Sequence, residues 1–184
     1  MARAGERRWV VTFAVVLVVV LLGLLAVAGL RLAQMRSVPL GVARERPAQG
    51  AGPTEVEVSA DAWVHPAGPA VQDALNRYFS AINDKDYRSW VATVTPAVAN
   101  QRPEATWLQG YASTTDGTIR ISRIDEAGPG RLVALVSYVS TQDAEDGPDD
   151  LKVPRICWRS SIPLVGSPPL VDMVKTSGVL RGSC

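Results

Sequence analysis

The chain has 184 residues, the length of one ordinary domain, and its 47% hydrophobic residues are unevenly distributed. The formal net charge of +1 conceals a basic N-terminal part, in which residues 1–50 carry seven arginines against Glu6 and Glu45, and a mildly acidic remainder. An acidic domain with scattered arginines and no basic stripe excludes nucleic acid as a partner.

Residues 9–30 have the pattern of a transmembrane helix. No residue from Trp9 to Leu30 is charged, and a helix of this length spans about 33 Å, close to the hydrocarbon thickness of a bilayer. The alternative is a cleavable signal peptide with Ala26-Val27-Ala28 as its cleavage site, although the apolar stretch of a signal is usually about 7–15 residues. We therefore predict a cytoplasmic tail over residues 1–8 and a membrane helix over residues 9–30 that contacts the lipid bilayer.

The orientation of this helix does not follow from charge. Arginines lie on both sides of it, at Arg3, Arg7, Arg8, Arg31, Arg36, Arg44 and Arg46, so the positive-inside rule gives almost no bias. The only two cysteines, Cys157 and Cys184, have no metal-ligand spacing, and paired cysteines suit an oxidising compartment. We predict a single-pass plasma-membrane protein with a cytoplasmic N-terminus and its domain outside.

Residues 31–66 are predicted to be a flexible linker, because proline and glycine interrupt every periodic pattern there. Within it, Thr54–Val58 alternates like a short strand that docks on the edge of the domain. The domain itself is predicted over residues 67–184.

Three helices are predicted at the start of this domain. Pro69 begins the first, whose apolar face is formed by Val71, Leu75, Tyr78, Phe79 and Ile82. A polar turn with Asp84 or Asp86 as the cap precedes a short helix over about 87–94, and Pro103 begins the third.

Strand-like alternation follows Asp116-Gly117, which we interpret as a turn. Strands are predicted over residues 118–124, 131–141, 153–162 and 170–175, with a last run near 179–180. Helices followed by a meander of about four strands indicate an α+β domain, with three helices packed on one face of a curved antiparallel sheet.

The segment Tyr78–Trp90, an aromatic helix face followed by Asn83-Asp84-Lys85-Asp86-Tyr87, resembles the opening of the nuclear-transport-factor-2-like superfamily, also called SnoaL-like or cystatin-like. The resemblance implies a cone-shaped fold over residues 67–184, of the membrane-anchored actinobacterial type. Some members of that superfamily are isomerases, cyclases or dehydratases, and fold alone does not choose among functions. Others are dimerising modules or membrane-anchored domains of envelope and conjugative-transfer assemblies, so the resemblance also implies envelope protein partners and a homodimer.

The cone of such a fold would be lined by Tyr78, Trp90, Trp107, Tyr111, Tyr138 and Trp158, which at helix and strand spacing are equally typical of a plain core. Asp125 and Asp172 are the expected buried carboxylates, or else outward strand residues. The single histidine, His65, lies in the linker, and no nucleophile motif, phosphate loop or metal spacing appears. We therefore expect no catalytic residue, cofactor or metal.

Two features of the last strands point to other contacts. The acidic residues of 143–150 do not have EF-hand spacing, and Arg155 and Arg159 are expected to pair with them or to contact an acidic partner. Cys157 and Cys184 are predicted to form a disulfide, since Gly178 and Gly182 let the tail fold back over the sheet. Two free thiols are the alternative.

Two functions fit these observations. The first is a non-catalytic, membrane-anchored interaction module outside the cell, within an envelope or conjugative-transfer or secretion assembly. The second is a small-molecule-binding or isomerase-like domain that uses an apolar cone. A cone without a buried carboxylate favours the first, and a pocket holding Asp or Tyr with a perturbed pKa favours the second.

Overall fold

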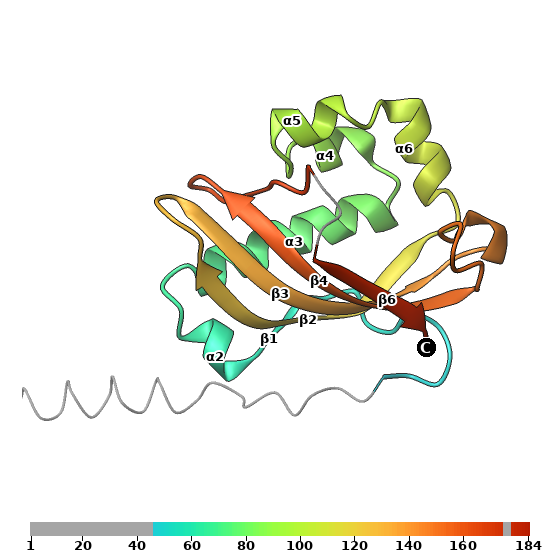
Figure 1. The fold of residues 1–184 in the computed structure, drawn as a ribbon, viewed down its shortest axis with the longest axis horizontal. Helices are drawn as coiled ribbons and strands as arrows, with labels where there is room; N and C mark the ends of the chain where they lie inside the picture. The colour runs from blue at the N-terminus through green and yellow to red at the C-terminus, as the bar shows by residue number, and fades with distance from the viewer. Residues whose placement is uncertain (1–45, 175–177) are drawn as a thin grey trace, which may run out of the picture. The chain divides into compact units, whose positions relative to one another are not determined.

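The computed structural model describes residues 46–174 and 178–184, and within them the chain forms an α+β domain with a mixed sheet (Figure 1). The predicted tail 1–8 and membrane helix 9–30 lie outside the described residues. Among the residues that are described, no helix is long and apolar enough to cross a membrane.

The described part contains five α-helices where the sequence predicts three. They are α2 (Ala60–Trp63), α3 (Gly68–Asn83), α4 (Tyr87–Val91), α5 (Pro96–Asn100) and α6 (Glu104–Tyr111). Pro69 occupies the first turn of α3, where its missing N–H costs nothing. Asp86 caps α4, since its carboxylate accepts a hydrogen bond from the Ser89 N–H at 3.0 Å.

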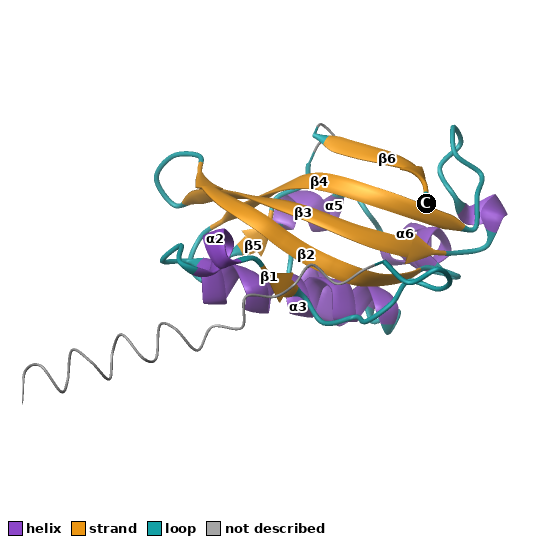
Figure 2. Cartoon of the chain, turned by 90° about the horizontal axis from the view of Figure 1, so that it is seen from below, coloured by secondary structure: helices purple, strands orange, loops and turns teal. Residues whose placement is uncertain are grey.

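The sheet has six strands: β1 (Glu57–Val58), β2 (Thr115–Glu126), β3 (Arg131–Thr141), β4 (Arg155–Val165), β5 (Leu170–Val171) and β6 (Val179–Ser183). β2, β3 and β4 form an antiparallel meander, and both β5 and β6 pair with β4. The prediction of a purely antiparallel sheet is wrong at one edge, because β1 runs parallel to β2. Figure 2 shows α3, α5 and α6 behind the sheet, so these helices cover one face.

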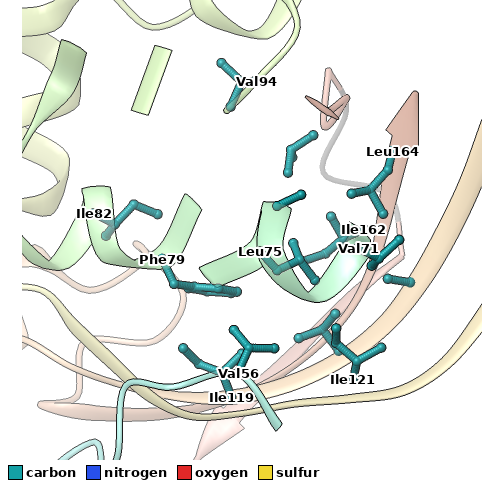
Figure 3. Close-up of a cluster of buried hydrophobic side chains, with 14 of the residues drawn as sticks. Val56, Val71, Leu75, Phe79, Ile82, Val94, Ile119, Ile121, Ile162 and Leu164 are labelled. Carbon is teal, nitrogen blue, oxygen red and sulfur yellow. The ribbon is translucent and has the colours of Figure 1, made fainter. Parts of the chain in front are cut away.

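The hydrophobic core lies between α3 and the sheet (Figure 3). Leu75 and Phe79 of α3 are at most 2% exposed and face Ile119 and Ile121 of β2 and Ile162 of β4. Burying a side chain of this size contributes about 1.5–3 kcal/mol. The apolar stripe that the sequence places on this helix is therefore the stripe that joins it to the sheet.

Part of the predicted linker 31–66 belongs to the fold. Val56 is 2% exposed, and its N–H donates to the Asn76 side chain at 2.9 Å. The Ser59 hydroxyl caps α2 and also donates to the Ser122 carbonyl of β2 at 2.6 Å. The Pro- and Gly-rich composition indicates a flexible linker. The hydrogen bonds made by the side chains of Asn76 and Ser59, together with the buried side chain of Val56, nevertheless hold the segment against the domain.

The C-terminal strand folds back onto β4, as the predicted disulfide requires. Gly178 adopts a φ of +83°, which other residues rarely adopt, at the point where the chain enters β6. β6 then pairs antiparallel with β4, with Gly182 opposite Cys157. Cys157 and Cys184 form a disulfide, their Cα atoms 5.1 Å apart.

Candidate ligand-binding cavity

A cavity of about 560 Å³ lies between α4–α6 and the face of the sheet that carries the core. Its wall contains all six aromatic residues that the sequence proposes as pocket lining: Tyr78, Trp90, Trp107, Tyr111, Tyr138 and Trp158. This volume lies within the range of small-molecule sites, about 300–1,000 Å³.

The helical side of the cavity is an aromatic cluster. The ring centroids of Trp90 and Trp107 are 5.4 Å apart, and those of Trp107 and Tyr111 are 5.2 Å apart. Both tryptophans are 1% exposed. The spacing of Trp107 and Tyr111 by four residues on α6 places both rings on the same side of that helix.

The sheet side of the cavity is formed by β3 and β4. Tyr138 and Trp158 are cross-strand partners, and their rings stack at a centroid distance of 5.8 Å. Phe79 of α3 contacts Tyr138 at 5.1 Å. The two aromatic sides thus converge on one hollow from elements that are distant in sequence.

The polar centre of the cavity is Asp116, which the sequence analysis assigns to a turn. It lies in β2 instead, is 3% exposed, and its Oδ1 accepts a hydrogen bond from the Ser140 hydroxyl on β3. The Asn83 side chain holds the backbone of Asp116 on both sides, accepting from its N–H at 2.7 Å and donating to its carbonyl at 2.9 Å. An asparagine of the motif 78–90 therefore positions this carboxylate.

A β-bulge explains why Asp116 points inward. Strict alternation from Ile119 and Ile121, both fully buried, would direct Asp116 to the outer face. The register of β2 with β3 shifts by one residue between Gly117 and Arg120, where Thr118 has a φ of +48°. Residue 117 is a glycine because a Cβ there would lie 2.5 Å from the Gly52 carbonyl oxygen, and not because the chain turns there.

Burial raises the pKa of Asp116 to about 6, against the smaller opposing effects of the Ser140 hydrogen bond and the Lys85 charge. Lys85 is itself held nearby, with its ammonium group donating to the Thr114 and Ile82 carbonyls. Burial lowers the pKa of this lysine, while Asp116 acts in the opposite direction. Asp116 therefore changes charge close to neutral pH.

Arg102 is a second polar cavity residue that the sequence analysis does not single out. Its guanidinium donates to the Tyr111 hydroxyl at 3.0 Å, and its carbonyl accepts from the Tyr87 hydroxyl at 3.0 Å. Burial raises the pKa of Tyr78, Tyr111 and Tyr138, so all three stay neutral hydrogen-bonding groups at physiological pH.

Three indole N–H groups of the cavity wall have no hydrogen-bond acceptor within the described part of the chain. They belong to Trp90, Trp107 and Trp158, and each nitrogen is buried. Buried donors in native proteins are nearly always paired. Each nitrogen is enclosed by neighbouring atoms, so these donors do not face the open space of the cavity.

The two carboxylates that the sequence nominates lie elsewhere. Asp125 is an exposed strand residue whose carboxylate pairs with Arg123 at 2.8 Å. Asp172 accepts from the Thr95 hydroxyl at 2.8 Å and lies 3.6 Å from Arg131. Neither lines the cavity, so of the two expectations stated for them the structure agrees with the second, in which they are not pocket carboxylates.

The predicted contact residues Arg155 and Arg159 lie on the outer face of β4. Arg155 donates to the carbonyl oxygens of Pro47 and Gly50, so it fastens the segment before β1 to the sheet. The acidic loop pairs with other cations, Asp149 with Lys152 at 3.3 Å and Asp150 with Arg181 at 2.6 Å.

The chain matches no family model, no curated protein and no solved structure. The resemblance of residues 78–90 to the nuclear-transport-factor-2-like superfamily stays a prediction from the sequence.

Proposed function

We propose that this domain binds a small planar molecule in the cavity, with Asp116 as its polar anchor. The observation that carries the proposal is a buried carboxylate with a pKa of about 6 inside a cavity walled by aromatic rings. Ionisable groups perturbed in this way are concentrated at functional sites. Of the two functions that the sequence leaves open, we therefore favour this one over the non-catalytic interaction module.

The lining defines the chemistry of the ligand. Asp116, when ionised, accepts a hydrogen bond, so the ligand carries an O–H or N–H donor. The rings on both sides suit a flat, mostly apolar body, because aromatic pairs stack or meet edge to face.

We further propose that binding occurs without chemical turnover, since the cavity lining contains no thiol, histidine or metal-ligand cluster. Proton transfer, as in an isomerase, is the second candidate. One observation favours it: a pKa of about 6 lies where a general base works efficiently.

Calorimetric titration with 2-naphthol and with naphthalene tests the anchor, using the full chain in one detergent throughout. At pH 8 we expect the naphthol to bind more tightly, because only its hydroxyl can donate to ionised Asp116. A hydrogen bond to a charged group contributes about 1.5–3 kcal/mol, roughly 10- to 100-fold in affinity. This preference should fall in Asp116→Asn, because the amide oxygen accepts only a hydrogen bond without the charge.

Asp125→Asn is the matched control, because Asp125 is a carboxylate on the same strand outside the cavity. It should leave both affinities unchanged. The absence of saturable binding by either probe, or an unchanged naphthol preference in Asp116→Asn, would contradict the proposal.

We also propose that residues 9–30 anchor the domain to the plasma membrane, with the domain outside and its partners in the cell envelope. Protease added to intact spheroplasts is expected to remove the domain and leave a short protected fragment, detected with a tag at the N-terminus. Survival of the domain until the membrane is permeabilised would place it in the cytoplasm.

A further inference from the structure

A second hollow, of about 360 Å³, is lined by outward-facing residues of β2, β3, β4 and β6, on the face of the sheet away from the core. Its lining includes four arginines, Arg46, Arg120, Arg159 and Arg181, together with Ser137, Leu180 and Gly182. We call this hollow the arginine groove.

The groove follows from the strand register. Arg120 of β2 is opposite Ser137 of β3, Ser137 is opposite Arg159 of β4, and Arg159 is opposite Leu180 of β6. Neighbouring strands are about 4.8 Å apart, so the two arginine backbones lie roughly 10 Å apart with a small serine between them. Gly182 is the cross-strand partner of Cys157, and because it has no side chain it leaves space in the groove.

The four arginines of the groove differ in their partners, and Arg181 pairs with Asp150 at 2.6 Å. Neither Arg120 nor Arg159 forms an ion pair within residues 46–174 and 178–184, and Arg46 approaches the sulfur of Cys157 at 3.6 Å. Glu57 is the one carboxylate among the described residues of the lining, and it is the cross-strand partner of Arg120. Unpaired guanidinium groups recognise carboxylates well, through two parallel hydrogen bonds.

The groove also has an apolar rim. Leu180 is 70% exposed, the second largest exposed fraction among the large hydrophobic residues of the described part. A hollow that holds arginines and a leucine suits a chain with both charged and apolar side chains better than a flat lipid surface.

We propose that the arginine groove binds an acidic peptide segment of a partner protein. Arg120 and Arg159 pair with carboxylates of that segment, and Leu180 contacts an apolar side chain beside them. This site lies on the opposite face of the sheet from the ligand cavity, and Tyr138, Trp158 and Arg181 belong to the linings of both.

Fluorescence anisotropy of the full chain with a labelled peptide of alternating glutamate and leucine tests the proposal. The wild type is expected to bind this peptide more weakly as salt is added, and to bind the matched glutamine–leucine peptide at least about tenfold less tightly. The double variant Arg120→Gln/Arg159→Gln should lose binding by a similar factor.

Arg77→Gln/Arg123→Gln is the control with the same change of charge, because these exposed arginines lie outside the groove and pair with Asp73 and Asp125. It should bind like the wild type, and thermal melting should show both double variants folded. If the groove variant melts early, Arg159→Gln alone should still weaken peptide binding.

Three results would overturn the proposal: equal binding of the two peptides, unchanged binding by a folded groove variant, or binding to phosphatidylglycerol vesicles without binding to the peptide. The last result would assign the groove to lipid.

Discussion

Asp116→Asn is expected to stabilise the domain at pH 8 by up to about 3 kcal/mol. The pKa of Asp116 is about 6 in the fold against 3.8 in an ordinary carboxyl group, and each pKa unit corresponds to about 1.4 kcal/mol. An asparagine avoids the cost of a buried charge, and its side-chain oxygen can still accept the Ser140 hydrogen bond.

The pH dependence has a defined sign. The unfolded chain releases the Asp116 proton near pH 3.8, while the folded chain keeps it until about pH 6. Between these values the unfolded state binds fewer protons, so this group makes the wild type less stable as pH rises. The advantage of the variant should therefore be small near pH 4, grow to about pH 6, and stay constant above it.

Urea unfolding of wild type and variant across this pH range measures the effect. Asp125→Asn is the control, and a change at this exposed position should stay within about 0.5 kcal/mol. A variant that is less stable than wild type at pH 8, or a difference that does not change with pH, would contradict the account of Asp116.

The buried carboxylate of Asp116 destabilises the domain at neutral pH, so folding does not explain its presence. Asparagine has a side chain of the same length and can also accept the hydrogen bond from Ser140. Folding alone therefore does not require a carboxylate at this position. Natural sequences keep such destabilising groups where activity needs them. The expected gain in stability and the expected fall in naphthol preference in the same variant are thus two consequences of one buried charge.

The aromatic wall of the cavity could be predicted because it depends on regular periods. Trp107 and Tyr111 are four residues apart on a helix, and Tyr138 and Trp158 lie on strands whose alternation is unbroken. Repeats of 3.6 and 2 residues determine which faces these side chains occupy. The predicted strand over residues 131–141 coincides with β3 for the same reason.

Asp116 and Arg102 could not be predicted because their positions depend on irregular backbone. The bulge at Gly117 and Thr118 reverses the alternation of β2, and an Asp-Gly pair is ordinarily a turn signal. Arg102 lies between α5 and α6, where no periodicity applies. The sequence predicts the docking of Thr54–Val58 but not that of residues 47–50, because Arg155 holds these through backbone carbonyls that any sequence would provide.

Removing the disulfide is expected to have the largest effect on stability. Cys157 and Cys184 are separated by 27 residues, and a bridge that closes a loop of this length contributes about 3–4 kcal/mol in the chain-entropy model. Cys184→Ser should lower the free energy of unfolding by about this amount, a large fraction of the 5–15 kcal/mol typical of a domain.

The loss should be concentrated in β6. This strand pairs only with β4, and its Leu180 and Arg181 are exposed. Amide exchange of residues 179–183 is therefore expected to accelerate more than exchange in β3, which is paired on both sides. Equal acceleration in both strands would mean that the bond stabilises the whole domain and does not hold the tail locally.

Comparison of the single and double variants separates the bond from the packing of its cysteines. Cys157→Ser, Cys184→Ser and the double variant each remove the same bond, so their free energies of unfolding should agree closely if the bond is what matters. Cys157 is only half-buried and Cys184 is exposed, so replacing either thiol should cost little through packing. Urea unfolding of the three variants and of the reduced wild type provides the measurement. Losses that add in the double variant, or a reduced wild type as stable as the oxidised one, would show that side-chain contacts hold β6 in place and that the bond does not.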